Sequence, residues 1–488
     1  MSMTPSTKSH RYTENRIGIG LTSPRLWMTA TIATFGGLLG TTFVGVFAQD
    51  AQTQGVYPAI AGVSALYFLA AFGLPWAINR PSLGIRRWVP WGAAGLTLIA
   101  VLGAIALWWL NRWGLGYQWI QTLKVVTGPY GWGDLKLYFD WLSCSQQGIN
   151  PISAPPGACM DEPMNYGPGF LWWTPLAILR PAMDLIGVIT AVVCALAIAW
   201  LARRSAPRGA LVLLLAALSP AWITLIERGN FDILIIWVAI AIVFLSHRFS
   251  GLWPWIVGAI LIFILGTWKY YPFAMVLTLI PVLAFRRGLW VVTGLMTAAL
   301  IYIGYYWNVA LGDMETHTGL SGGIGRTTLA AFFAGEAEPD PNFGWADGAV
   351  LALIAFSALW GASIATQLGH RRVAKLERPA MLAVAGSVTI IGSVVLAGSG
   401  FIYKSALLLL TVPLLAALTR SGSGVMWRSG LTYLGIVLVA VFVEWNLLAS
   451  SAALQLAAGF TFGLSIVVLV RRLIVIRSRH VDSHTATT

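Results

Sequence analysis

The stretch ERGNFDILIIWVAIAIVFLSHR, residues 227–248, sets the fold class of this chain. Its middle is almost entirely apolar, and its charged residues stand only near the two ends. A helix that crosses the ~30 Å hydrocarbon core of a bilayer needs about 20 mostly apolar residues, and this stretch comes close to that length. We therefore predict a membrane-spanning helix over 231–246, with Arg228 and Arg248 at opposite membrane surfaces.

Similar apolar stretches recur along the chain. Of its 488 residues, 57% are hydrophobic and only 10% are charged, which excludes a single water-soluble core. We predict an all-α, polytopic helical membrane protein with about 14 membrane-spanning helices. These are placed at 26–48, 57–79, 88–110, 184–202, 209–226, 231–246, 252–268, 272–285, 288–310, 347–368, 380–397, 401–418, 429–447 and 452–470. The short apolar segment 169–179 is predicted to be a re-entrant or interfacial helix, because a further crossing there would invert every later loop.

The charges divide between the two sides of this predicted topology. Most of the 31 lysines and arginines fall on one side, and most of the 18 acidic residues fall on the other. The positive-inside rule makes the basic side cytoplasmic, so both termini are predicted there and the acidic face is external. The net charge of +13 then reflects topology, and nucleic-acid binding is not expected. The excess of arginine over lysine favours a bacterial plasma membrane, with the endoplasmic reticulum as the alternative.

Two of the predicted external loops are long, 111–167 and 311–346, and the other connections are short. Loops longer than about 12–15 residues without a fold of their own are usually functional or disordered, and the aromatic and glycine content of these two favours function.

The first long loop is predicted to carry short amphipathic helices and a disulfide. Cys144 and Cys159 both lie in it, on the external and therefore oxidising side. Paired cysteines in such a compartment commonly form a disulfide, with two free thiols as the alternative. Cys194 lies inside a predicted span, where we expect a small apolar core residue.

Two aspartates of this loop are candidate catalytic bases. Asp134 and Asp140 follow the span 88–110, and Asp134 has Trp132, Tyr138 and Trp141 as neighbours. A carboxylate in such a setting can take a proton from an acceptor hydroxyl. The alternative is that both carboxylates only help to solvate the outer surface, and the choice between the two as base stays open.

Basic residues that break the positive-inside pattern suggest a phosphate site. Arg228, Lys269 and Lys404 stand at the outer ends of predicted spans, where ionisable residues are costly and tend to be functional or paired. Cations near tyrosines and an asparagine suit a phosphate headgroup. Each could instead snorkel to the interface, and Arg228 could pair with Glu227 or Asp232. The predicted phosphate-binding residues are Arg228, Lys269, Lys404 and Arg326.

Several short motifs, taken in chain order, resemble those of the polyprenyl-phosphate-dependent GT-C glycosyltransferases. Among these enzymes, the bacterial mannosyl- and arabinofuranosyltransferases are the most similar group. The matching positions are Asp134 and Tyr138, Gly148 to Pro151, Asn165 to Pro168, Arg228 to Asp232, Lys269 to Pro272, and Tyr403-Lys404. The chain departs from the usual pattern at Gly167, where a second proline is common, and at Arg228, where a glutamine-type variant occurs. The resemblance covers roughly 88–418 and implies a catalytic membrane core there. Residues 1–87 would then hold a cytoplasmic leader and two extra membrane helices, and 419–488 the C-terminal helices and tail. Because of these departures and extra spans, the resemblance leaves the sugar and the acceptor open.

The resemblance implies a GT-C-like fold and an inverting transfer on the external face. Mannose or arabinofuranose would pass from a polyprenyl-phosphate donor to a glycolipid or polysaccharide acceptor, with Asp134 as the base. It implies no cofactor and no metal, and membrane lipids are the other expected partners. The implied sugar- and acceptor-binding residues are Tyr138, Asn165, Tyr166, Asn230, Asp232, Tyr271 and Tyr403.

Other protein classes share parts of this pattern. A lipid-linked glycan polymerase or ligase, or a flippase, would need a similar lipid-phosphate site. A secondary transporter would more often carry charges near the membrane midplane and related halves. A purely structural membrane subunit would not explain the one-sided set of aspartates and cations.

Overall fold

The structure of the chain, a computed structural model, describes most of the residues from 132 onward. The described ranges are 132–155, 166–217, 219–285, 287–307, 344–396, 402–420, 424–442 and 447–485, with a few isolated positions at 91–98, 157–164, 324–330 and 399–400. All of them belong to one compact unit, Pro58–Thr488. The predicted spans 26–48 and 57–79 lie outside the described residues, and so do most of the span 88–110 and most of the loop 311–346.

The described part is helical, and much of it is apolar enough for a membrane. Five helical segments there are long and apolar enough to cross a bilayer: Pro168–Arg204, Gly288–Tyr305, Trp345–Thr366, Gly424–Val441 and Ser450–Ser478. Four shorter apolar helices accompany them: Pro207–Ala216, Trp253–Lys269, Tyr271–Ala284 and Tyr403–Leu418. The chain is therefore a helical membrane protein.

From residue 183 onward the helices lie at the predicted spans, although His370–Leu396 begins well before the span 380–397 and Leu447–Thr485 extends beyond both ends of 452–470. In chain order they are α5 (Gly133–Gln146), η1 (Pro168–Ala182), α6 (Met183–Arg204), α7 (Pro207–Ala216), α8 (Pro220–Glu227), α9 (Asp232–Arg248), α10 (Trp253–Lys269), η2 (Tyr271–Ala284), α11 (Gly288–Tyr305), α14 (Trp345–Thr366), α15 (His370–Leu396), η3 (Ile402–Thr411), α16 (Val412–Leu418), α17 (Gly424–Phe442) and α18 (Leu447–Thr485). The elements labelled η are 3₁₀ helices.

Three predicted segments are divided differently in the structure. The span 401–418 holds η3 and α16. The span 209–226 is divided into α7 and α8, because Pro220 cannot continue a helix from α7 and Ser219 caps α8 by accepting a hydrogen bond from the backbone N–H of Trp222. The segment 169–179 lies in η1, which packs against α5 and continues directly into α6. By length and composition the two form one candidate span of 37 residues, Pro168–Arg204.

One short strand pair adds to the predicted all-α fold. Residues Ile324–Gly325 (β1) pair antiparallel with Ser399–Gly400 (β2), with Ile324 opposite Gly400. This pair joins part of the second long loop to the segment that leads into η3.

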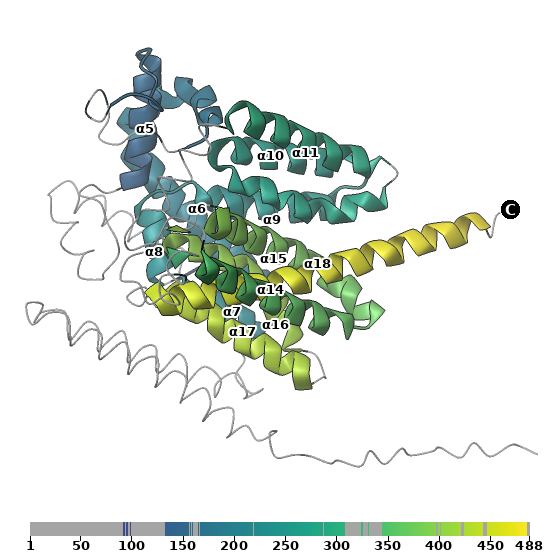
Figure 1. Cartoon of the computed structure of the whole chain (residues 1–488). Helices are drawn as coiled ribbons and strands as arrows, with labels where there is room; N and C mark the ends of the chain where they lie inside the picture. Colours follow the sequence, from purple (N-terminus) through teal and green to yellow (C-terminus); the bar gives the residue numbers. More distant parts are fainter. Residues whose placement is uncertain are drawn as a thin grey trace, which may run out of the picture. The chain divides into compact units, whose positions relative to one another are not determined.

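The largest helix contact is made by α18, which packs along α14 and α15 (Figure 1). Glycines permit the close approach: a Cβ atom at Gly463 would lie 1.8 Å from the carbonyl oxygen of Ala358, and one at Gly361 would lie 2.0 Å from that of Phe460. Small residues at helix contacts are typical of membrane proteins, where close packing drives association.

Arginines join the helix ends that were predicted to be cytoplasmic. The side chain of Arg472 donates to Glu377 Oε2 at 2.7 Å. Three others donate to backbone carbonyls at helix ends: Arg208 to Thr419 at 3.2 Å, Arg471 to Ala365 at 2.7 Å, and Arg477 to Leu283 at 2.7 Å. Helix C-termini leave carbonyls without intrahelical partners, so basic side chains stabilise them.

Candidate functional site

The site begins where α5 docks on the turn between α8 and α9. The backbone N–H groups of Asp134 and Leu135 both donate to the carbonyl of Arg228, at 3.0 and 3.1 Å. The turn needs Gly229, whose φ of +61° is rarely adopted by residues with a side chain, and a Cβ there would lie 3.0 Å from Leu135 Cβ. The first turn of α5 is therefore fixed against residues almost a hundred positions later.

The Asp134 carboxylate is buried and held by two side chains. Arg228 donates to Oδ1 through Nε at 2.7 Å and also through Nη2. Asn230 donates from Nδ2 to Oδ2. Since each carboxylate oxygen can accept about two hydrogen bonds, Oδ2 retains capacity for a further donor.

Asn230 connects Asp134 to the rest of the site. Its Nδ2 also donates to the hydroxyl of Tyr403 at 2.8 Å, and its Oδ1 accepts from Lys269 Nζ and from the backbone N–H of Asp232, both at 2.9 Å. The residue is 1% exposed. The turn, the end of α10 and the start of η3 thus meet at one amide.

A second ion pair lies beside Asn230. Asp232 Oδ1 accepts from Lys269 Nζ at 2.7 Å and from the hydroxyl of Tyr271 at 2.6 Å. Among the described residues, Asp232 Oδ2 is buried without a hydrogen-bond partner. The structure therefore pairs Arg228 with Asp134 and Asp232 with Lys269. Of the two local partners suggested for Arg228, Asp232 pairs with Lys269, and the Glu227 side chain lies outside the described part.

Strained backbone stands next to both ion pairs. Within the part of the chain that the structure describes, Trp132 and Tyr270 are the non-glycine residues with positive φ, at 59° and 53°. Trp132 comes just before Asp134, and Tyr270 comes directly after Lys269. Such conformations cost roughly 1–3 kcal/mol each, persist only where the surroundings enforce them, and cluster at functional sites. Sequence reasoning missed this feature, because neither residue type signals it.

Buried aromatic rings cover one side of the network. The hydroxyls of Tyr138 and Tyr166 are 2.6 Å apart, and the ring of Tyr138 stacks on Phe231 at 4.2 Å. Lys269 Nζ lies 4.6 Å from the centre of the Tyr166 ring, a cation–π contact. Burial raises the pKa of Tyr138 and of Tyr166 well above the usual value, so both hydroxyls stay protonated at neutral pH.

The start of η3 adds the last two predicted residues that the structure describes. Tyr403 and Lys404 are buried, at 4% and 5% exposure. Lys404 Nζ lies 5.1 Å from the centre of the Tyr271 ring. The structure thus brings these two residues into the neighbourhood of the Asp232–Lys269 pair.

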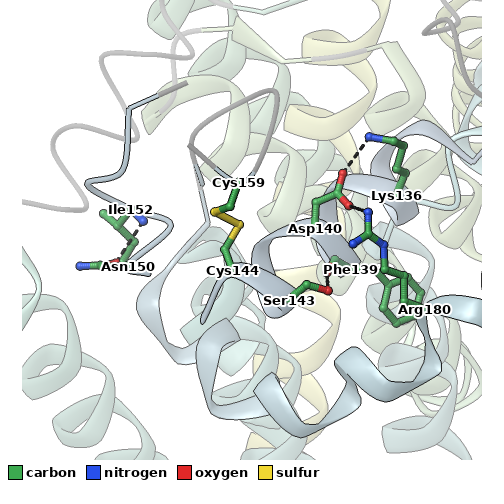
Figure 2. Close-up of a disulfide and its surroundings, with 9 residues drawn as sticks. All are labelled: Lys136, Phe139, Asp140, Ser143, Cys144, Asn150, Ile152, Cys159 and Arg180. Carbon is green, nitrogen blue, oxygen red and sulfur yellow. Dashed lines mark hydrogen bonds and ion pairs between the residues drawn. A yellow bond between two sulfur atoms is a disulfide. The ribbon is translucent and has the colours of Figure 1, made fainter. Parts of the chain in front are cut away.

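Asp140 lies apart from this network. Its carboxylate accepts from Lys136, one turn earlier on α5, and from Arg180 on η1 (Figure 2). The Lys136 contact measures 2.8 Å. The Arg180 contact joins α5 to η1. Of the two candidate bases, only Asp134 contacts the Arg228–Asn230 turn.

A disulfide closes the same loop near the other end of α5. Cys144 and Cys159 are joined, with their Cα atoms 5.8 Å apart (Figure 2). The free Cys194 is buried in α6. The disulfide fixes the chain that follows α5 without contacting Asp134 at the helix start.

Two predicted residues, Asn165 and Arg326, lie outside the described residues. Among those described, no group of three or more His, Cys, Asp or Glu side chains gathers as a metal site would require. Comparisons with family models, with curated proteins and with solved structures found no match to this chain.

Proposed function

We propose that this chain is an inverting membrane glycosyltransferase of GT-C-like fold that uses a polyprenyl-phosphate sugar donor. The observation that carries the proposal is the position of Asp134. Its carboxylate is held by Arg228 and Asn230, beside a second cation, Lys269, and under a cover of tyrosines. A base next to cations at one end of a helical membrane protein suits transfer from a lipid-linked phosphate.

In the proposed reaction, Asp134 is the general base. The oxygen of an acceptor hydroxyl attacks the anomeric carbon of the sugar while its proton passes to Asp134 Oδ2. The bond between that carbon and the phosphate oxygen breaks, and the electron pair leaves with the polyprenyl phosphate. Arg228, Lys269 and Lys404 stabilise the negative charge of the leaving phosphate. Ion pairing with Asp134 and Asp232 keeps the first two cations in the site before the donor arrives.

The wider parts of the proposal concern topology and substrate. About 14 helices cross a bacterial plasma membrane, both termini are cytoplasmic, and the site faces outward. The arginine contacts among helix ends support one part of this topology, namely that the ends which the positive-inside rule places together lie on the same side. Mannose or arabinofuranose is the proposed sugar, and a glycolipid or polysaccharide is the proposed acceptor.

Transfer by the purified protein tests the proposal. Polyprenyl-phosphate mannose, arabinofuranose and glucose are offered separately with a membrane glycolipid extract. Asp134→Asn should lower transfer by at least roughly 1,000-fold, because the amide cannot take the proton. Asp140→Asn is the matched control, since it makes the same change on the same helix but outside the network, and it should retain transfer.

Two results would contradict the proposal. Transfer that persists in Asp134→Asn would exclude this residue as the base. No transfer from any donor by the folded wild-type protein would instead favour a polymerase, a flippase or a transporter.

A further inference from the structure

The Asn230 side chain has no hydrogen-bonding capacity left for a ligand. An amide offers two N–H donors and an oxygen with two lone pairs. Both donors are used, on Asp134 Oδ2 and on the Tyr403 hydroxyl, and the oxygen accepts from Lys269 and from the Asp232 backbone. A sugar hydroxyl could bind Asn230 only by displacing one of these partners in a buried site.

Charge fixes which way the amide points. In the observed orientation, the NH₂ group faces the Asp134 carboxylate and the oxygen faces the Lys269 ammonium. Rotation by 180° would place the oxygen against the carboxylate and the NH₂ group against the ammonium, so two favourable contacts would become two repulsive ones. Only one orientation is therefore stable, and an N–H always points at Asp134 Oδ2.

We propose that Asn230 is a positioning residue that orients the Asp134 carboxylate and contacts neither sugar nor acceptor. This differs from the ligand-binding role that the family resemblance implies. It rests on the proposed function, in which Asp134 is the base. Arg228 holds Oδ1 and Asn230 holds Oδ2, so the plane of the carboxylate is fixed. The remaining acceptor position of Oδ2 therefore points in a fixed direction.

Two substitutions separate positioning from ligand binding. Asn230→Ala removes all four hydrogen bonds. Asn230→Asp keeps acceptors for Lys269 and the Asp232 backbone but loses both donors and sets a second carboxylate beside Asp134. Asn150→Asp is the matched control, because the exposed Asn150 Oδ1 accepts from the Ile152 backbone and an aspartate can do the same.

For both Asn230 variants we expect kcat to fall by roughly 100-fold, with KM for donor and acceptor changed by less than about 3-fold. In Asn230→Asp the acid limb of the pH–rate profile should also move to higher pH. The negative charge of the new carboxylate repels that of Asp134, so Asp134 loses its proton only at a higher pH. Neither change is expected in Asn150→Asp. A raised KM with kcat retained would show that Asn230 contacts the ligand, and would overturn the proposal.

A labelling experiment tests the same point without turnover. A hydrophobic carbodiimide modifies protonated carboxyl groups, and peptide mass spectrometry can follow Asp134 as pH is varied. The midpoint of Asp134 modification should move to higher pH in Asn230→Asp and stay in place in Asn150→Asp. An unchanged midpoint would overturn the positioning role. If the midpoint moves but the protein transfers no sugar, the positioning role of Asn230 stands and the proposed glycosyltransferase function is rejected.

Discussion

At the level of single residues, each of the two aspartates of α5 pairs with an arginine from another element, and the two pairs differ in how deeply they are buried. In the pair of Arg228 with Asp134, the side chains are 15% and 9% exposed, whereas Arg180, which pairs with Asp140, is 53% exposed. Removing one partner of a buried pair leaves an uncompensated charge and costs about 3–5 kcal/mol, but an exposed pair contributes only about 0–1 kcal/mol. The first pair should therefore matter far more for stability.

We predict that Arg228→Gln lowers the free energy of unfolding by about 3 kcal/mol and abolishes transfer, because Asp134 stays buried without its cation. Arg180→Gln should cost at most about 1 kcal/mol, since Asp140 keeps Lys136 and the arginine is half exposed. Thermal unfolding of both variants in the same detergent measures the difference. Equal shifts would contradict the assignment of Asp134 to the buried network.

Sequence alone could name both aspartates but could not choose between them. Asp134 and Asp140 lie about 120° apart around the axis of α5, so they face different neighbours. Those neighbours come from distant segments: the α8–α9 turn supplies Arg228, and η1 supplies Arg180. The choice depends on tertiary contacts that no local pattern records.

At the level of elements, two glycines bring η1 against the end of α10. A Cβ at Gly167 would lie 2.3 Å from the Thr267 carbonyl oxygen, and one at Gly169 would lie 2.4 Å from Thr267 Cβ. The Gly167 N–H donates to the Trp268 carbonyl at 2.7 Å, immediately before Lys269. Gly167, where the glycosyltransferases that the sequence resembles commonly have proline, thus permits a close backbone contact next to the site.

We predict that Gly167→Ala or Gly169→Ala lowers transfer at least 10-fold and the free energy of unfolding by about 1–3 kcal/mol, because the added methyl group pushes η1 away from α10 and moves Lys269. Gly304→Ala on α11 is the matched control. A Cβ there meets nothing within 4 Å, so helix propensity should make it neutral or stabilising by up to about 1 kcal/mol. Calorimetry and the transfer assay check all three, and unchanged Gly167 and Gly169 variants would refute the packing argument.

From residue 183 onward the helices were largely predictable from the sequence, but their interruptions were missed. Uniformly apolar runs show where a chain crosses a membrane, so the ends of α6, α9 and α10 were found to within a few residues. The same uniformity hides the helical period that would show which face is buried. The break at Pro220 could have been predicted from its residue type, but the β1–β2 pair joins segments too far apart for a sequence pattern to reveal.

On the scale of the whole molecule, the described polar contacts include two separate groups at helix ends. Asp134, Asn230 and Lys269 come from three segments that meet at one network. The arginines of the predicted cytoplasmic side contact one another's helix ends instead. The positive-inside rule predicts that these two groups lie on opposite sides of the membrane, because it depends only on how often each charge occurs in each loop. The pairing within the network depends on packing and was not foreseen.

If the proposed orientation holds, the two groups of helix ends lie on opposite sides of the membrane. We predict that a cysteine introduced at the exposed Ser153, in the loop after α5, reacts with a membrane-impermeant maleimide in intact cells. A cysteine at the exposed Ser478, near the end of α18, should react only after the membrane is permeabilised. The wild-type chain should give little background, because Cys194 is buried and the other two cysteines form the disulfide. Labelling of Ser478→Cys in intact cells would reverse the topology and place the Asp134 network in the cytoplasm. The donor would then have to present its sugar on the cytoplasmic face, and the external acceptor class would be excluded.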